Sequence, residues 1–214
     1  MENRRVICNR GIKMIAILDY DAGNLKSVEN ALQRLGQECV VTGDAAVIQS
    51  ADKVILPGVG AFGDAMEKLR SLGLVETIQK VVQEKKPFLG ICLGLQLLFD
   101  SSDEAPGVKG LGILPGKIVA FPKKEGYKIP HMGWNSLEIT PSARLFDGVA
   151  QGAYVYFVHS FYLEAANEED VVAATEYIAH VHASVEHENI FACQFHPEKS
   201  SEVGLHILKN FIEL

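Results

Sequence analysis

The stretch that most constrains the fold of this chain runs from Lys86 to Phe99 and reads KPFLGICLGLQLLF. It contains a short apolar run, a cysteine between two glycines, and an apolar segment of helical character. Pro87 fixes the entry, so Phe88 to Ile91 is predicted to be a buried strand and the residues after Cys92 a helix. Glycine near both sides of the cysteine allows a sharp turn and close packing of the backbone. The pattern therefore predicts a nucleophile elbow, in which a strand turns abruptly into a helix.

A cysteine at such a turn lies at the start of a helix, near backbone N–H groups that have no partner within the helix. These groups favour the thiolate, which is the reactive form of the side chain. They can also hold the oxyanion that forms when sulfur attacks a carbonyl. The alternative is a buried, unreactive cysteine, because free cysteine is among the most buried residue types. A base elsewhere in the chain is needed to decide between these interpretations of Cys92.

A candidate base follows a strand predicted from Ile190 to Gln194. Pro197 ends this strand, so His196 is expected at the edge of the sheet, facing a crevice. Glu198 can accept a hydrogen bond from one ring nitrogen, which leaves the other nitrogen free to take a thiol proton. Cys92, His196 and Glu198 are therefore the candidate nucleophile, base and orienting carboxylate.

The N-terminal half alternates between apolar strands and amphipathic helices, which is the pattern of an α/β fold with a doubly wound, mostly parallel sheet flanked by helices. The predicted strands are Met14 to Leu18, Cys39 to Thr42, Val54 to Leu56 and Phe88 to Ile91, and the predicted helices are Leu25 to Leu35, Ala61 to Leu72 and Leu74 to Lys85. Ligands of such sheets bind beyond the carboxyl ends of the strands. The segment Pro57 to Gly60 and Cys92 are therefore expected to face the same crevice.

The C-terminal half is predicted to hold a smaller, antiparallel portion, because proline and glycine are frequent from Pro106 to Gly133 and strongly β-prone segments follow. The predicted strands are Lys117 to Phe121, Tyr154 to Tyr162, Val171 to Thr175 and His180 to Glu186, and a last helix runs from Ser201 to Ile212 with Ser200 or Ser201 as its cap. The apolar pattern begins at Met14. We therefore expect an N-terminal extension over residues 1–13 and one domain over residues 14–214.

Composition excludes several classes of protein. The net charge of −7 argues against a general nucleic-acid surface, which needs clustered lysine and arginine. No apolar run approaches the roughly 20 residues of a membrane helix, so no membrane contact is expected. The four cysteines form no C-x-x-C pair, which favours a reducing, cytoplasmic location. His180 and His182 alternate on one strand without a third ligand at a sensible spacing, so no metal site is expected.

Together the two motifs and the Pro57 to Gly60 segment resemble those of the class I, triad-type glutamine amidotransferases, whose fold is flavodoxin-like. The resemblance covers Met14 to Leu214. Within that family, three segments resemble the glutaminase subunits of imidazole glycerol phosphate synthase, an enzyme of histidine biosynthesis. They are LDYDAGNL from Leu18, PGVGAF from Pro57 and PHMGWN from Pro130.

The resemblance implies hydrolysis of glutamine to glutamate and ammonia. In this mechanism Cys92 attacks the side-chain amide, His196 protonates the departing ammonia, and water hydrolyses the glutamyl thioester. The oxyanion hole implied by the family comprises Leu93 and the loop containing Val59 and Gly60. Gly58 and Gly60 of the Gly58-Val59-Gly60 segment would let a peptide flip at low cost. We therefore hypothesise that the oxyanion donor is misdirected until a partner binds its own ligand.

The resemblance also implies which residues bind substrate and partner. Substrate binding is expected at Gly58, Gln96, Ser160 and Phe161, and the partner interface at Met132, Trp134, Asn135 and Lys199. The implied partner is the cyclase (synthase) subunit, which forms a heterodimer with the glutaminase and uses ammonia to convert PRFAR into imidazole glycerol phosphate and AICAR. No cofactor is implied. From the local sequence alone, Trp134 would be interpreted as a core aromatic and Lys199 as a solvated charge.

Three alternatives remain at this point. The first is the glutaminase subunit of another amidotransferase, serving anthranilate, aminodeoxychorismate, guanylate or pyridoxal phosphate synthesis, because these share the triad. The second is a cysteine peptidase or stress-response hydrolase on a similar sheet, from which Gln96 and the His-Pro-Glu motif would not be expected. The third is a catalytically inactive binding module, against which the complete triad argues.

Overall fold

A computed structural model describes residues 13–21 and 24–214, so the predicted N-terminal extension lies outside the described residues except for Lys13. The central element is an eight-stranded sheet in the order β2-β1-β3-β4-β13-β12-β11-β8. Its strands are β1 (Ile15–Leu18), β2 (Cys39–Thr42), β3 (Lys53–Gly58), β4 (Phe88–Cys92), β8 (Glu138–Ile139), β11 (Val171–Glu176), β12 (His180–His187) and β13 (Ile190–Cys193). The pairs from β2 to β13 are parallel and the remaining pairs are antiparallel. The predicted fold class is therefore confirmed.

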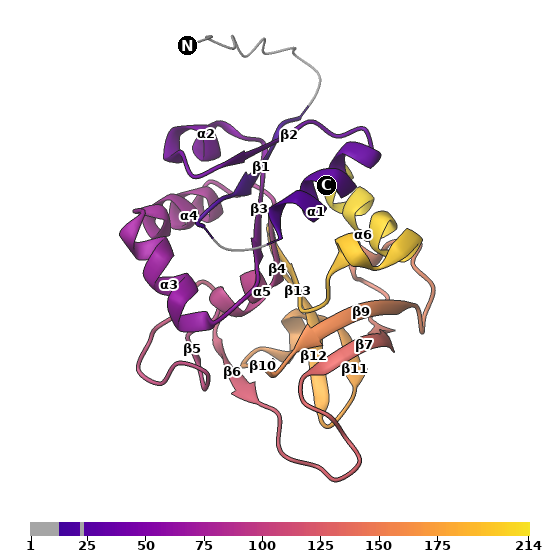
Figure 1. Cartoon of the computed structure of the whole chain (residues 1–214). Coiled ribbons are helices and arrows are strands. Elements are labelled where there is room, and N and C mark those ends of the chain that lie inside the picture. The colour runs from indigo at the N-terminus through magenta and orange to yellow at the C-terminus, as the bar shows by residue number, and fades with distance from the viewer. Residues whose placement is uncertain (1–12, 22–23) are drawn as a thin grey trace.

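Helices cover both faces of this sheet (Figure 1). They are α1 (Leu25–Arg34), α2 (Ala45–Ser50), α3 (Phe62–Ser71), α4 (Leu74–Gln83), α5 (Leu93–Leu97) and α6 (Ser201–Glu213), and three single 3-10 turns are η1 (Arg144–Phe146), η2 (Glu168–Asp170) and η3 (Pro197–Lys199). Successive side chains of a strand point to opposite faces. In β1, Ile15 and Ile17 pack in the core that contains α1 and α6, whereas Ala16 and Leu18 pack in the core that contains α3 and α4.

Two smaller sheets lie beside the carboxyl end of the parallel strands (Figure 1). One has the order β10-β6-β5, and the other pairs β7 with β9. Their strands are β5 (Ser101–Ser102), β6 (Gly116–Ala120), β7 (His131–Ser136), β9 (Tyr154–His159) and β10 (Phe161–Ala165). The predicted continuous strand from Tyr154 to Tyr162 is wrong, because the chain bends at Ser160 and continues into a different sheet.

Two further features differ from the sequence-based expectations. Helix α2 was not predicted, although Asp44 caps it by accepting hydrogen bonds from the N–H groups of Ala46 and Val47. Ser200 is the N-cap residue of α6 but makes no capping hydrogen bond with its side chain. Its hydroxyl instead donates to the carbonyl of His196 at 2.6 Å.

Among the described residues, no helix has the length and apolar character needed to cross a membrane.

Candidate active site

The predicted nucleophile elbow forms where β4 ends and α5 begins, with Cys92 as the N-cap residue. Cys92 has a φ of 56° and a ψ of −108°, a backbone conformation that L-residues rarely adopt and that is found at strained functional turns. The side chain is 7% exposed. The turn therefore holds the sulfur at the mouth of the crevice, at the carboxyl end of the parallel strands.

Two glycines allow the elbow to pack against the neighbouring strand. A Cβ atom on Gly94 would lie 1.8 Å from the carbonyl oxygen of Leu56 in β3. A Cβ on Gly90 would lie 2.7 Å from the carbonyl oxygen of Gly94. Because both neighbours are backbone atoms, neither contact can be relieved by rotating a side chain. These positions therefore require glycine for close packing of α5 on the sheet.

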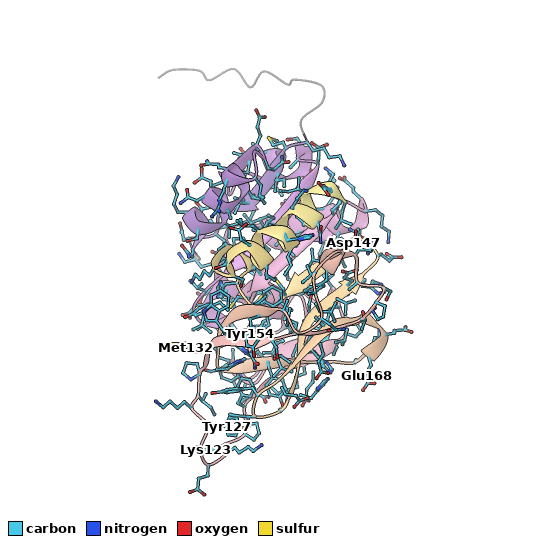
Figure 2. The ribbon with its side chains drawn as sticks, turned by 90° about the vertical axis from the view of Figure 1, so that its right-hand side faces the viewer. Lys123, Tyr127, Met132, Asp147, Tyr154 and Glu168 are labelled. Carbon is cyan, nitrogen blue, oxygen red and sulfur yellow. The ribbon has the colours of Figure 1, made fainter. Side chains whose placement is uncertain are left out.

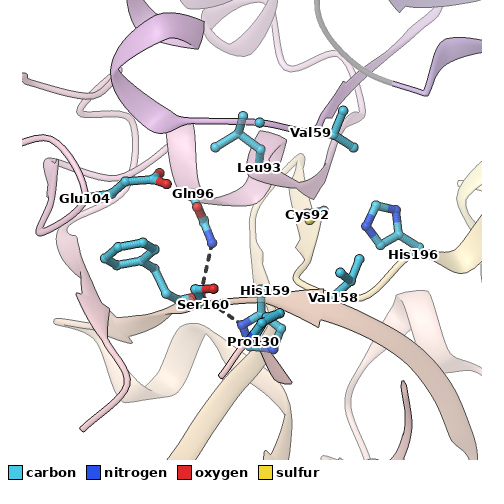
Figure 3. Close-up of a pocket in the computed structure, with 12 residues that line it drawn as sticks. Val59, Cys92, Leu93, Gln96, Glu104, Pro130, Val158, His159, Ser160 and His196 are labelled. Carbon is cyan, nitrogen blue, oxygen red and sulfur yellow. Dashed lines mark hydrogen bonds between the residues drawn. The ribbon is translucent and has the colours of Figure 1, made fainter. Parts of the chain in front are cut away.

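His196 and Glu198 lie beside the elbow, just beyond the end of β13. The Nδ1 atom of His196 donates to Oε1 of Glu198 at 2.8 Å, and both side chains are at most 2% exposed. The Nε2 atom of His196 is buried and has no hydrogen-bond partner among the described residues. Figure 3 shows this ring beside Cys92. The carboxylate thus fixes the ring tautomer and leaves Nε2 available for proton transfer.

Strand β9 and Ser200 hold the histidine in place. The N–H of His196 donates to the carbonyl of Tyr156 at 2.9 Å. The N–H of Tyr156 in turn donates to the Ser200 hydroxyl at 2.9 Å, and that hydroxyl donates to the His196 carbonyl. Ser200 is fully buried, so its hydroxyl is used to support the site and is not available to cap α6.

The charge state of His196 depends on opposing effects. Burial lowers its pKa, whereas the Cys92 side chain and Glu198 raise it, and the net result is a pKa raised to about 9. At neutral pH both ring nitrogens of His196 therefore carry a proton, and the ring is positively charged. The charged ring can act as the acid that protonates a leaving group, beside the candidate nucleophile Cys92.

This raised pKa predicts a pH dependence of stability. An unfolded histidine titrates near pH 6.5, so the stabilisation contributed by charged His196 is complete below pH 6.5 and is lost as the pH rises through about 9. We expect the difference in unfolding free energy between wild type and His196→Gln to shrink between pH 6.5 and 9 in urea titrations. A difference in unfolding free energy that stays constant over this pH range would contradict the raised pKa of His196.

A cavity of about 400 Å³ opens in front of the elbow (Figure 3). Most of its lining comes from the loop that holds Val59 and Gly60, from the elbow and α5, from the β9–β10 bend and from His196. The lining residues are Val59, Gly60, Cys92, Leu93, Gln96, Glu104, Pro130, Val158, His159, Ser160, Phe161 and His196. The structure thus brings most of the predicted site residues, from segments far apart in the sequence, to one cavity.

Two of the residues predicted to act in catalysis or substrate binding do not line this cavity. Glu198 lies behind His196 and reaches the site only through the histidine ring. Gly58 is buried in β3 beside Cys92, and a Cβ there would lie 2.6 Å from the Tyr20 hydroxyl. Gly58 is absent from the cavity lining, and substrate binding by its backbone stays a prediction. Its role in the structure is close packing, since the Tyr20 hydroxyl donates to the neighbouring Pro57 carbonyl at 3.0 Å.

Two polar residues of the site were not predicted from the sequence. Glu104 lines the cavity, and its Oε2 accepts a hydrogen bond from the N–H of Phe62 at 2.8 Å. Gln194 is fully buried, and its side chain links Gln96 at 3.0 Å to the sulfur of Cys92 at 3.7 Å. Neither belongs to a recognisable local motif. The position of Gln194 two residues before His196 was the one available signal.

The expected partner surface lies on the outer face of β7 and β9. Met132 is 62% exposed and Trp134 is 50% exposed, and Tyr154, across the ladder, is 58% exposed. Figure 2 labels Met132 and Tyr154. Trp134 is therefore not a core aromatic. Asn135 points the other way, and its amide donates to the carbonyl of Glu176 at 2.8 Å, so its side chain does not fit a direct partner contact. Lys199 is exposed at the end of η3.

The two histidines considered as metal ligands have other contacts. His180 contacts Glu176, and the Nδ1 atom of His182 accepts from the N–H of Ala165 at 3.1 Å. Within residues 13–21 and 24–214, no group of three or more histidine, cysteine or acidic side chains is arranged to hold a metal ion.

Comparison with known proteins identifies a family and close relatives of this chain. Residues 16–214 match the family described as "Glutamine amidotransferase class-I". The chain is 51% identical to "Imidazole glycerol phosphate synthase subunit HisH" of Methanothermobacter thermautotrophicus, with 94% of this chain and 98% of that protein aligned. It is 47% identical to the protein of the same name from Methanocaldococcus jannaschii, with 94% and 100% aligned.

Solved structures resemble the chain in fold. "Structure of PurLQS from Thermotoga maritima" aligns with a TM-score of 0.74 at 19% identity, covering 94% of this chain and 98% of that chain. "Crystal structure of glutamine amidotransferase" aligns with a TM-score of 0.71 at 20% identity, covering 92% and 98%. At these identities the likeness concerns the fold alone.

Proposed function

The chain belongs to the class I glutamine amidotransferase family, and from this premise we propose that it is the glutaminase subunit of an imidazole glycerol phosphate synthase. It hydrolyses glutamine to glutamate and ammonia and delivers the ammonia to a synthase subunit in histidine biosynthesis. The observation that carries this proposal is the cavity in which Cys92, His196 and Gln96 meet, with Glu198 behind the histidine. The names and identities of the relatives support the pathway.

The geometry supports a two-step reaction. Cys92 attacks the side-chain amide carbon of glutamine, and the proton on His196 passes to the departing ammonia. Water then attacks the thioester, with His196 as the base, and glutamate leaves. The N–H of Leu93 and an N–H of the Val59–Gly60 loop are the proposed oxyanion donors.

The proposed gating of the oxyanion loop depends on Gly60 more than on Gly58. Gly60 has a φ of +102° and no atom within 4 Å of an added Cβ, whereas Gly58 is enclosed by Tyr20 and Leu93. A peptide next to Gly60 can therefore reorient without displacing neighbours. We propose that partner binding shifts this loop toward a conformation in which an N–H points at the oxyanion.

Glu104 is proposed to hold the α-amino group of glutamine. Its carboxylate reaches the cavity (Figure 3) and faces the site from the side opposite His196. A carboxylate that binds an ammonium group in a partly buried site contributes about 1.5–3 kcal/mol. This contribution would select a free amino acid over a peptide-bound glutamine.

We expect Glu104→Gln to raise the KM for glutamine by about 10- to 100-fold while kcat changes little. The introduced amide side chain can still accept the hydrogen bond from Phe62. Asp103→Asn is the matched control, because the adjacent Asp103 pairs with Lys117 outside the cavity. Steady-state kinetics of glutamate release would measure both variants. Equal KM values for the two variants would contradict the role of Glu104.

We propose that the synthase subunit forms a heterodimer with this chain through the outer face of β7 and β9. Met132, Trp134 and Tyr154 leave a large apolar area exposed there, and aromatic residues and methionine are enriched at protein interfaces. The face lies next to Pro130 and Val158, which line the cavity. Ammonia released at Cys92 would thus have a short path to the partner.

The domain range 14–214 and a cytoplasmic location remain predictions.

Growth of auxotrophic bacteria would test the pathway. A strain that lacks its own glutaminase subunit for histidine synthesis should grow without histidine when it expresses this chain. The Cys92→Ala variant should fail to restore growth on limiting ammonia. Rescue of a tryptophan or vitamin auxotroph without rescue of the histidine auxotroph would instead favour one of the other amidotransferases.

A further inference from the structure

Two buried histidines face each other across β7 and β9. His131 and His159 are directly opposite in the antiparallel ladder, and they are 3% and 6% exposed. The Nδ1 atom of His131 lies 2.9 Å from the Nε2 atom of His159. Both rings lie on the inner face of this two-stranded sheet, while the outer face carries Met132 and Trp134.

The hydrogen bonds of this pair determine which nitrogens carry protons. A carbonyl oxygen can only accept, so the Nδ1 atom of His159 donates to the Phe161 carbonyl at 2.9 Å. In a neutral ring the Nε2 atom of His159 must then accept, and the Nδ1 atom of His131 donates to it. The Nε2 atom of His131 is left as an acceptor, and the amide of Asn135 lies 3.4 Å away to donate. Donors and acceptors therefore alternate along the whole series of hydrogen bonds.

The surroundings favour two neutral rings. Burial lowers the pKa of His131 to about 4 and that of His159 to about 3. The His131 ring stacks between Phe157, at a centroid distance of 4.7 Å, and Tyr177, at 4.0 Å. The proton on His196 further disfavours charge on His159. At neutral pH both rings thus keep the alternation of donors and acceptors.

The other end of the series lies in the proposed glutamine pocket. The Phe161 carbonyl also accepts from the side-chain amide of Gln96 at 3.1 Å, as the dashed line in Figure 3 shows. That amide contacts Gln194, whose own amide lies 3.7 Å from the Cys92 sulfur. A continuous series of hydrogen bonds therefore connects β7 with the nucleophile.

We propose that His131 and His159 form a relay of neutral hydrogen bonds that positions the Phe161 carbonyl in the glutamine pocket and couples this position to strand β7. The inference rests on the proposed function. Both histidines are positioning residues, because they act on the substrate site through Phe161 and Gln96. A displacement of β7 by a partner on its outer face would lengthen or shorten the bond between the two rings. The Phe161 carbonyl and Gln96 would then shift together.

Variants of His159 separate the two parts of the proposal. His159→Leu removes the donor to Phe161, so the KM for glutamine should rise by about 3- to 10-fold, which corresponds to one hydrogen bond. The amide of His159→Asn can still donate to Phe161 but cannot reach His131. Its KM should therefore rise less than that of His159→Leu. Both variants should lose most of the stimulation of glutamate release by a synthase subunit with its ligand.

Two further variants serve as controls for the His159 substitutions. His131→Leu should resemble His159→Asn, since it cuts the relay but leaves the bond to Phe161. His180→Leu changes an exposed histidine of β12 outside the relay and should behave like wild type. Equal KM values for His159→Leu and His159→Asn would overturn the positioning role of His159. Full stimulation of glutamate release by the synthase subunit in either variant would overturn the coupling to strand β7. Absence of glutaminase activity in wild type would overturn the proposed function itself.

The protonation pattern can also be measured without any substitution. Nitrogen-15 NMR of the histidine rings of the wild-type chain at pH 7 should show that both His131 and His159 carry their proton on Nδ1. A proton on Nε2 of either ring, or a charged ring, would overturn the relay even if the variants failed to fold.

Discussion

Replacement of Cys92 by alanine is expected to abolish glutamine hydrolysis, lowering kcat by about 10⁴-fold or more. The reason is that the substitution removes the sulfur atom that forms the glutamyl thioester. The fold should be retained, because the Cys92 backbone and not its side chain makes the elbow, and alanine adds no atom to a site that is 7% exposed. Glutamate release by the purified variant, with circular dichroism to verify the fold, is the measurement.

Cys193 provides the matched control for this experiment. It is fully buried on β13, next to β4, and its sulfur donates to the Phe195 carbonyl at 3.5 Å. Burial raises its pKa well above the usual range, so it is an unreactive thiol. Cys193→Ala should lower stability by about 1 kcal/mol and leave kcat within about 3-fold of wild type. Loss of activity in both variants would point to packing damage and away from a nucleophile at Cys92.

Replacement of Gly94 by alanine is expected to cause the largest loss of stability among single methyl additions at the elbow. The new Cβ would lie 1.8 Å from the Leu56 carbonyl oxygen, so α5 must move away from β3. Overpacking against rigid backbone costs about 3 kcal/mol or more. Because Leu93 and Gln96 move with α5, hydrolysis should fall as well. Urea denaturation and glutamate release would measure the two effects.

A glycine elsewhere serves as the control for this substitution. Gly63 lies in α3, where an added Cβ would meet only the Ala105 Cβ at 3.3 Å, and alanine favours the helix. Gly63→Ala should change stability by less than about 1 kcal/mol and leave activity intact. A Gly94→Ala protein as stable and active as Gly63→Ala would show that the close approach of α5 to β3 does not exist.

Much of the fold could be predicted because its signals are local. The apolar runs of β1, β2 and β4 and the amphipathic patterns of α3 and α4 each follow from consecutive residues, and the structure matches those ranges within one or two residues. Helix α2 was missed because six residues give too few turns for a period to show. The break at Ser160 was missed because it depends on which strands pair with β9 and β10, which is a tertiary property.

Site residues could likewise be predicted only where a local sequence motif contains them. Cys92, His196 and Glu198 could be predicted because each belongs to a short motif with its own chemistry. Glu104 and Gln194 could not, since they reach the cavity from positions without a motif. The inward direction of the Asn135 side chain also depends on register, because neighbouring residues of β7 face opposite sides.

The proposed relay bears on how such an enzyme could avoid wasting glutamine. Strand β9 is hydrogen bonded on one side to β7, whose outer face is apolar and exposed, and on the other side to the backbone of His196. A partner bound to the outer face could therefore affect both the substrate site, through His159, and the base, through Tyr156. Two connections of this kind would couple hydrolysis to the presence of the synthase.

The central claim is tested most directly by the rate of glutamate release from glutamine, measured with the purified chain alone and after addition of an imidazole glycerol phosphate synthase subunit with its nucleotide substrate. We predict slow release by the chain alone and strong stimulation in the mixture, both abolished by Cys92→Ala. Fast release that does not respond to the synthase subunit would contradict the proposed pathway, and no release in either condition would contradict the glutaminase assignment.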